Sequence, residues 1–128
     1  MRRLAPLLLI GCACASPVEP PAVEAAALAD TRSTQGPFPV TARVSSSRPL
    51  HTVELVWRDV AAAQGAVRTP MAQDQPGVWR AAIPGLGAGA RVAYHVEAAT
   101  EDGDRGYDPP GSRSSAGCGP ELCFSVLP

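Results

Sequence analysis

From residue 36 to the C-terminus, apolar and polar side chains alternate along short segments, a period of two that is typical of half-buried β-strands. In the clearest segment, 92–98, one face is apolar and the other carries His95 and Glu97. Further strands are expected at 40–44, 53–58, 66–69, 78–83 and 122–127. Turns rich in Gly, Pro, Ser and Asp separate them. Six or seven short strands of this kind predict an all-β chain that folds as a small β-sandwich.

The alternation also assigns side chains to the inside or the outside of the sandwich. Trp57 and Trp79 fall on inward faces, where a Trp side chain fills a core. Val56 is an apolar exception on the outer face of its strand, and His95 is expected to be a half-exposed surface residue. Cross-strand charge pairs on a shared face are expected among Arg58, Arg80, Arg91, Glu54 and Glu97.

The N-terminus carries a different signal. Met1-Arg2-Arg3 and the short apolar run 4–10 are together typical of a secretory signal. The run contains Pro6 and has only seven residues, whereas a membrane-spanning helix needs about 20. The quartet Leu9-Ile10-Gly11-Cys12 resembles the lipobox of bacterial lipoproteins. That resemblance implies a signal peptide at 1–11, cleavage before Cys12 and a lipid on the new N-terminal cysteine.

The same resemblance implies a location in the bacterial cell envelope, with the membrane bound through the lipid on Cys12. Ala13, rather than Asp, follows the cysteine, which implies the outer membrane by the sorting preference of enteric-type lipoproteins. Cys14 is a second cysteine nearby, and the sequence leaves its modification open. Residues 12–35 are rich in Ala and Pro and contain no aromatic residue, which predicts a flexible, disordered tether before a sandwich at 36–128.

Two further cysteines lie near the C-terminus, in the sequence Cys118-Gly-Pro-Glu-Leu-Cys123. In an oxidising envelope compartment this pair is expected to form a disulfide, worth roughly 2 kcal/mol by chain entropy for so short a loop. A zinc site is the sharper alternative. It needs two more ligands, and the only histidines, His51 and His95, are far away in the sequence. Two free thiols are the remaining alternative.

Charge excludes one class of partner. Without Arg2 and Arg3 the chain has nine Arg against 12 Asp plus Glu, a net charge of about −3. Nucleic-acid binding needs clustered basic residues that displace counterions from phosphates. The sequence therefore predicts no nucleic-acid partner.

Three segments follow one another in a familiar order: Val53-Glu54-Leu55-Val56-Trp57-Arg58, then Gly77-Val78-Trp79 leading to Pro84-Gly85-Leu86, then an alternating strand that ends in Glu97-Ala98. This order resembles fibronectin type III and early-set immunoglobulin-like domains of bacterial envelope proteins, over about residues 38–127. No cysteine lies on the strands that antibody domains link. The tyrosine-corner position falls on Val92, with Tyr94 two residues later, which favours the early-set group over a strict type III domain. The resemblance implies an immunoglobulin-like sandwich that acts as a non-catalytic binding or structural module.

An alternative function comes from the same block, which also looks like the carbohydrate-binding modules attached to glycogen-processing enzymes. Exposed aromatic residues stack on sugars in those modules, so Trp79 and Trp57 are candidate ligand contacts. Tyr107 is a third candidate, because it opens a long loop that extends to Pro120, and long loops on rigid sandwiches often bind partners. The partner would be a protein or a polysaccharide of the envelope.

No catalytic motif is found, and the chain is not expected to be an enzyme or to hold a cofactor. Residues 85–90 formally fit the dinucleotide-binding fingerprint. That motif requires a helix N-terminus facing the pyrophosphate, whereas residues 91–97 alternate as a strand. The segment is instead expected to be a hairpin-type turn. Serine hydrolysis has no support either, since the G-x-S-x-G elbow is absent.

The acidic stretch 101–108 offers Asp102, Asp104 and Asp108 as candidate calcium ligands. Aligned with an EF-hand loop it fails, because Tyr107 falls at the glycine position and Arg113 at the position of the bidentate Glu. We expect a solvated turn here and no metal. Whether the three carboxylates bind calcium in another geometry is left open by the sequence.

Overall fold

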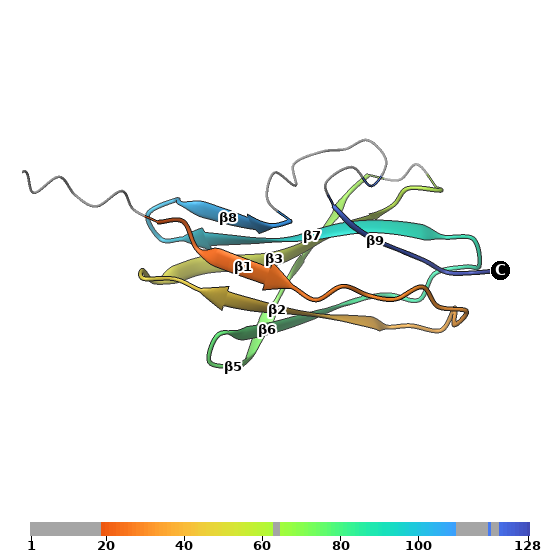
Figure 1. The fold of residues 1–128 in the computed structure, drawn as a ribbon, viewed down its shortest axis with the longest axis horizontal. Helices are drawn as coiled ribbons and strands as arrows, with labels where there is room; N and C mark the ends of the chain where they lie inside the picture. The colour runs from red at the N-terminus through yellow and green to blue at the C-terminus, as the bar shows by residue number, and fades with distance from the viewer. Residues whose placement is uncertain (1–18, 63–64, 110–117, 119–120) are drawn as a thin grey trace, which may run out of the picture.

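Two antiparallel β-sheets lie face to face in the part of the chain that the computed structural model describes, residues 19–62, 65–109, 118 and 121–128 (Figure 1). The first sheet has the order β1-β2-β6-β5, formed by Ala22–Ala25, Phe38–Ser45, Val78–Ile83 and Ala72–Gln75. The second has the order β4-β3-β7-β8, formed by Val67–Pro70, Leu50–Asp59, Arg91–Thr100 and Arg105–Asp108. β9 (Leu122–Ser125) also pairs with β7. Within these residues no helix is long and apolar enough to cross a membrane.

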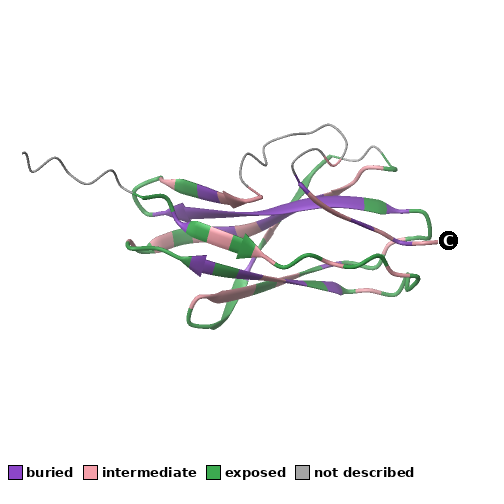
Figure 2. Ribbon diagram, in the orientation of Figure 1, coloured by how far each residue is buried: buried purple, intermediate pink, exposed green. Residues whose placement is uncertain are grey.

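β7 is the centre of the second sheet. β3 pairs with it along one edge, whereas β8 and β9 follow one another along the opposite edge. β8 pairs with the segment 96–99 and β9 with the segment 91–94. With neighbours on both sides and the first sheet beneath, every residue of β7 after Arg91 is buried (Figure 2).

The core lies between the sheets and contains the inward residues of β2, β3, β6, β7 and β9. Its largest fully buried side chains include Tyr94, Phe124, Leu55 and Ile83. Phe124 packs edge-on against Phe38 and Tyr94, with ring centroids 5.3 and 6.1 Å away. Aromatic pairs prefer this arrangement, which joins the C-terminal strand to both sheets.

The prediction of a small all-β sandwich is confirmed, and the expected strands correspond to β2, β3, β4, β6, β7 and β9. Three strands were not expected. β1 lies in the predicted tether, β5 lies within a segment read as a turn because of its Gln, Asp and Pro residues, and β8 lies at the end of the acidic stretch. All three are short and lack large apolar residues at every second position, so they show no clear alternation.

The expected flexible tether at 12–35 is wrong from Ala22 onward, because this segment is bound to both sheets. β1 pairs with β2 over four residues, from Ala22 opposite Ser45 to Ala25 opposite Ala42. The domain therefore begins at least 14 residues before the expected boundary at residue 36. Alanine-rich sequence carries little side-chain signal, and tertiary contacts order it here.

Side-chain and backbone contacts extend this attachment beyond β1. The hydroxyl of Tyr94 donates to the carbonyl of Ala26 at 2.9 Å and accepts the N–H of Leu28 at 2.8 Å. Further along, Thr31 forms a parallel bridge with Val126, and its N–H donates to the carbonyl of Ser125 at 3.0 Å. The N-terminal segment thus crosses from the first sheet to the end of the second.

The expectation of a hairpin-type turn at residues 85–90 is also wrong. β6 belongs to the first sheet and β7 to the second, so this turn connects the two layers. Gly85 makes the connection possible, since a Cβ there would lie 2.7 Å from the carbonyl oxygen of Thr34. A side chain at this position would push the turn away from the N-terminal segment.

Candidate functional site

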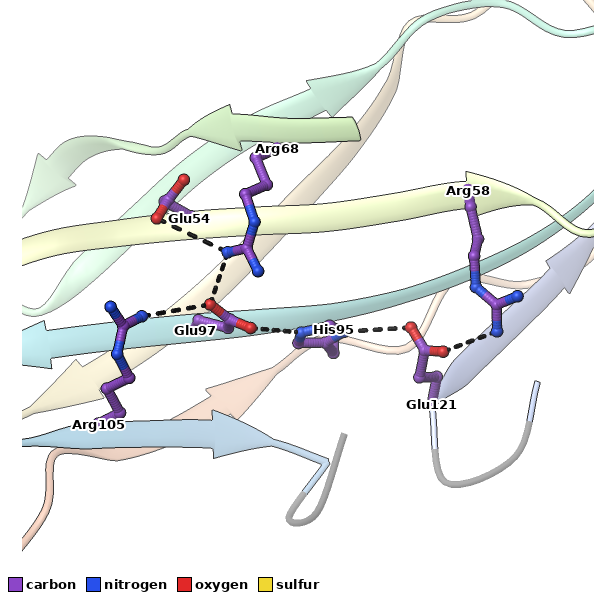
Figure 3. Close-up of polar contacts among 7 residues, drawn as sticks. All are labelled: Glu54, Arg58, Arg68, His95, Glu97, Arg105 and Glu121. Carbon is purple, nitrogen blue, oxygen red and sulfur yellow. Dashed lines mark hydrogen bonds and ion pairs between the residues drawn. The ribbon is translucent and has the colours of Figure 1, made fainter. Parts of the chain in front are cut away.

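A network of charged side chains covers the outer face of the second sheet (Figure 3). Four strands of that sheet and the residue before the fifth contribute to it, because antiparallel register places the strand residues on one face. Its members are Glu54 and Arg58 from β3, Arg68 from β4, His95 and Glu97 from β7, Arg105 from β8, and Glu121 just before β9. We call these seven residues the outer-face network.

His95 lies at the centre of the outer-face network, between two carboxylates. Its Nε2 is 3.0 Å from Oε1 of Glu97, and its Nδ1 is 3.1 Å from Oε2 of Glu121. The three side chains are only 6, 8 and 3% exposed. The expectation of a half-exposed surface histidine is therefore wrong. Other side chains cover the outer face of β7 in this structure, and the ring forms hydrogen bonds with carboxylates instead of with water.

Glu97 is the most heavily contacted carboxylate of the network. In the sheet it lies directly opposite Glu54, a like-charge pair that would be destabilising alone. Arg68 resolves this conflict, since its Nη1 is 2.7 Å from Oε2 of Glu97 and 3.9 Å from Oε1 of Glu54. Arg105 approaches the same Glu97 oxygen from the other side, at 3.6 Å.

Burial of Glu97 disfavours its charge and acts to raise its pKa, but the hydrogen bonds from Arg68 and His95 outweigh this effect. The pKa of Glu97 is therefore lowered from its ordinary value. In return, the hydrogen bond and the charge of Glu97 raise the pKa of Arg68. Both groups are charged across the neutral range, so the network is ionic.

Glu121 joins the C-terminal segment to the network. Its Oε1 accepts a hydrogen bond from Nη2 of Arg58 at 2.9 Å, while its other oxygen faces His95. Its backbone N–H donates to the carbonyl of Cys118 at 2.7 Å. The side chains of Glu121 and Arg58 are 3 and 11% exposed. Removing one partner from such a buried pair is strongly destabilising, because the other charge is left buried.

The expected charge pairing on shared faces is partly wrong in its partners. Glu54 and Glu97 do form cross-strand pairs, but with Arg68 and Arg105. Arg80 lies in the other sheet and pairs with Asp74 at 3.1 Å.

The outer-face network offers little reactive chemistry. Both ring nitrogens of His95 already contact carboxylates, so the ring has no nitrogen directed at an open surface. Across the described residues, no three His, Cys, Asp or Glu side chains are placed to hold a metal ion. The arrangement can hold the strands of the sheet together.

The three candidate ligand contacts lie apart. Trp57 is buried in the core, at 7% exposure, and Trp79 is half-buried on the inward face of the first sheet, as the alternation predicts. Trp79 lines a pocket of about 340 Å³ together with Arg48, Leu50 and Gln73. Neither indole N–H has an acceptor among the described residues. Tyr107 lies on the outer face of β8, its ring 6.3 Å from that of His95.

The cysteine predictions divide by position. Cys118 and Cys123 form the expected disulfide, with Cα atoms 6.0 Å apart. Cys12 and Cys14 lie outside the described residues, as do Pro120 and most of the loop before it.

The acidic stretch forms the expected turn, closed by the N–H of Gly103 on the carbonyl of Thr100. Its carboxylates point to separate partners. Asp102 pairs with Arg48 at 2.6 Å, while Oδ2 of Asp108 accepts the N–H of Ala25 at 2.6 Å.

Several residues of the network carry a weak signal in the sequence. Arg68 is on a short strand, Arg105 is in the acidic stretch and Glu121 is in the cysteine loop, so none stands out. One signal does exist. Val56, the apolar exception on its outer face, is the register partner of His95 and is 4% exposed. An apolar residue on a supposedly solvated face indicates that this face is covered.

No family model and no curated protein matches this chain. Among solved structures, it is similar to part of a cycloalternan-degrading enzyme from Trueperella pyogenes, with 19% identity and a TM-score of 0.41. The match covers 57% of this chain and 10% of that enzyme. The chain therefore corresponds to a small part of the enzyme's length, and no functional argument follows from the match.

Proposed function

We propose that this chain is a lipoprotein of the bacterial cell envelope, anchored to the outer membrane through a lipid on Cys12. Its immunoglobulin-like sandwich acts as a non-catalytic binding or structural module. The observation that carries the proposal is the Leu9-Ile10-Gly11-Cys12 quartet directly after a short apolar run. The sandwich is the part of the protein that this anchor would hold at the membrane surface.

The attachment of the N-terminal segment supports an anchoring role. Only ten positions separate Cys12 from Ala22, a reach of at most about 35 Å in an extended chain. From Ala22 the chain pairs with β2. Further along, Ala26 accepts a hydrogen bond from Tyr94, and Thr31 bridges to Val126 near the C-terminus. A lipid on Cys12 would therefore keep the folded domain within that distance of the membrane surface.

A non-catalytic role is supported by the chemistry of the outer-face network. Its histidine, carboxylates and arginines contact one another at 2.7 to 3.9 Å. Groups that satisfy one another in this way stabilise a surface, and carboxylates already engage both ring nitrogens of the histidine. We therefore assign binding or structural work to the module.

The anchor is tested by substituting the cysteine and fractionating cells. Cys12→Ala is expected to move the protein from the membrane to the soluble fraction, while the sandwich stays folded. Cys14→Ala is the matched control and is expected to stay with the membrane. Persistent membrane association of folded Cys12→Ala would overturn the proposed anchor.

A second candidate function is a carbohydrate-binding module, favoured by the pocket at Trp79. Trp79 lines this pocket with Arg48 and Gln73, and an aromatic residue beside polar side chains suits a sugar ring, which needs both an apolar surface and polar groups. Its volume, about 340 Å³, would take one or two sugar units. The other tryptophan, Trp57, is buried and does not line this pocket.

Binding assays with bacterial and storage polysaccharides test this second candidate. A polysaccharide that binds is expected to lose roughly tenfold or more in affinity with Trp79→Ala, because the stacking face is removed. Val67→Ala removes an exposed apolar side chain of the other sheet that does not line the pocket, and is expected to leave affinity unchanged. If no polysaccharide of the panel binds the unsubstituted chain, the carbohydrate function is abandoned.

A further inference from the structure

A pocket of about 540 Å³ lies on the outer face of the first sheet, where β1, β2 and the turn between β5 and β6 meet (Figure 1). Two cross-strand pairs line it. Glu24 of β1 lies directly opposite Arg43 of β2, and Ala22 lies directly opposite Ser45. All four residues are exposed, because their neighbours along each strand face the core. The volume is within the range of small-molecule sites, about 300–1,000 Å³.

The two charged side chains of this pocket have opposite signs, and neither has a partner. Residues directly opposite in antiparallel strands have Cβ atoms about 4.5–5.5 Å apart, so Glu24 and Arg43 lie side by side. No ion pair joins them, and within the described part of the chain neither one pairs with another residue. Arg80, on the same face, is in contrast paired with Asp74 at 3.1 Å. The pocket therefore presents a free carboxylate next to a free guanidinium.

These groups suit a ligand that carries both charges. A guanidinium donates two parallel hydrogen bonds to a phosphate, and a carboxylate accepts hydrogen bonds from a primary ammonium. The hydroxyl of Ser45 adds a donor or acceptor, and Ala22 and Val78 add apolar surface. Phosphoethanolamine has a phosphate and a primary ammonium joined by a short carbon chain, which matches this arrangement. Inorganic phosphate lacks the ammonium.

The position of the pocket indicates where such a ligand would come from. Ala22 lines the pocket, and Pro20 lies beside Ser45 at the turn after β2. Ten positions separate Cys12 from Ala22, a reach of at most about 35 Å. A lipid on Cys12 would therefore hold this pocket near a bilayer surface. Phosphoethanolamine is present there as the headgroup of a zwitterionic phospholipid.

We propose that this pocket binds the headgroup of phosphatidylethanolamine, with the phosphate on Arg43 and the ammonium on Glu24. A bound headgroup holds the outer face of the first sheet against the bilayer, so the sandwich takes a fixed orientation there. The membrane as the source of the headgroup rests on the proposed anchor at Cys12. The match between the headgroup and the pocket does not.

The first test is a titration of the full chain, in a nonionic detergent, with glycerophosphoethanolamine. Amide NMR signals of residues 22–24, 43–45 and 77–78 are expected to shift to saturation, with a Kd of about 1–10 mM. Glycerophosphocholine keeps the phosphate, but its quaternary ammonium has no N–H, so it should bind at least about fivefold more weakly. Equal binding of the two probes, or binding of neither, would overturn the proposal and leave the anchor at Cys12 standing.

Charge-removing variants test the two contacts in the same titration. Arg43→Gln and Glu24→Gln are each expected to weaken binding of glycerophosphoethanolamine at least about fivefold. Arg91→Gln is the matched control, because it removes an exposed arginine of the other sheet that does not line the pocket, and it should bind normally. Full affinity in either pocket variant contradicts the proposed contacts.

The source of the headgroup is tested with the lipidated protein in phosphatidylcholine nanodiscs, made with and without phosphatidylethanolamine. The shifts seen with the free probe are expected only in discs that contain phosphatidylethanolamine. The same signals in both kinds of disc would overturn the membrane as the source, even where the free probe binds. A chain that does not associate with either disc would overturn the anchor, and with it the membrane source.

Discussion

The hydroxyl of Tyr94 holds two residues after β1, Ala26 and Leu28, to the core. The ring is fully buried, and burial is the main cause that raises the pKa of this phenol, which therefore stays a neutral donor well into alkaline conditions. Tyr94→Phe keeps the ring contact with Phe124 but leaves the Ala26 carbonyl and the Leu28 N–H without this partner. We expect a loss of about 1–3 kcal/mol in the free energy of unfolding, measured by urea denaturation. A loss of less than about 0.3 kcal/mol in the free energy of unfolding would show that water replaces the hydroxyl.

Glu97 makes the free energy of unfolding depend on pH in the acid range. Its pKa is lowered in the folded state, so its contribution to stability is present above the ordinary pKa of a Glu and is lost as the pH falls through the lowered value. Glu97→Gln is expected to flatten the stability profile below about pH 4.5 and to destabilise the chain at neutral pH. Glu101→Gln, on an exposed turn, is the matched control. A Glu97→Gln chain that keeps the full acid dependence would assign that dependence to another carboxyl.

At the scale of the element, β1 depends on a glycine in the opposite sheet. A Cβ on Gly106 of β8 would overlap the carbonyl oxygen of Pro21 and lie 3.4 Å from Cγ2 of Val23. Gly106→Ala should therefore separate β1 from β8 without removing any core side chain. Amide exchange at residues 22–25 is expected to rise at least tenfold, since edge strands open locally at low cost. Gly87→Ala, which meets nothing within 4 Å, should leave this exchange unchanged. Equal amide exchange rates at residues 22–25 in both variants would contradict the close packing of β1 against Gly106.

The strands that could be predicted from sequence are those with large apolar residues at every second position, such as β3 and β7. The four-residue strands β1, β5 and β8 could not, because they depend on neighbours from distant parts of the chain. β1, for example, contains only one large apolar residue, Val23, and is placed by β2, Asp108 and Gly106. The same holds for the outer-face network. His95 and Glu97 are visibly on one face, but their burial depends on Glu121, 24 residues beyond Glu97 in the sequence.

On the scale of the whole molecule, the first described residues and the C-terminus lie at opposite ends of the sandwich (Figure 1). Pro20 lies near the turn after β2, whereas the carbonyl of Pro128 accepts a hydrogen bond from Arg32 at the other end. In a protein anchored at Cys12, the end that carries Pro128 and the turn 84–90 would therefore face away from the membrane.

The mass of the intact mature protein, purified from the membranes of its bacterial host, tests the central claim most directly. We expect a chain that begins at Cys12 and carries the added mass of acyl chains on that residue, with the Cys118–Cys123 disulfide intact. A chain that keeps Met1, or one that begins elsewhere with an unmodified Cys12, would contradict the account of a lipid-anchored sandwich.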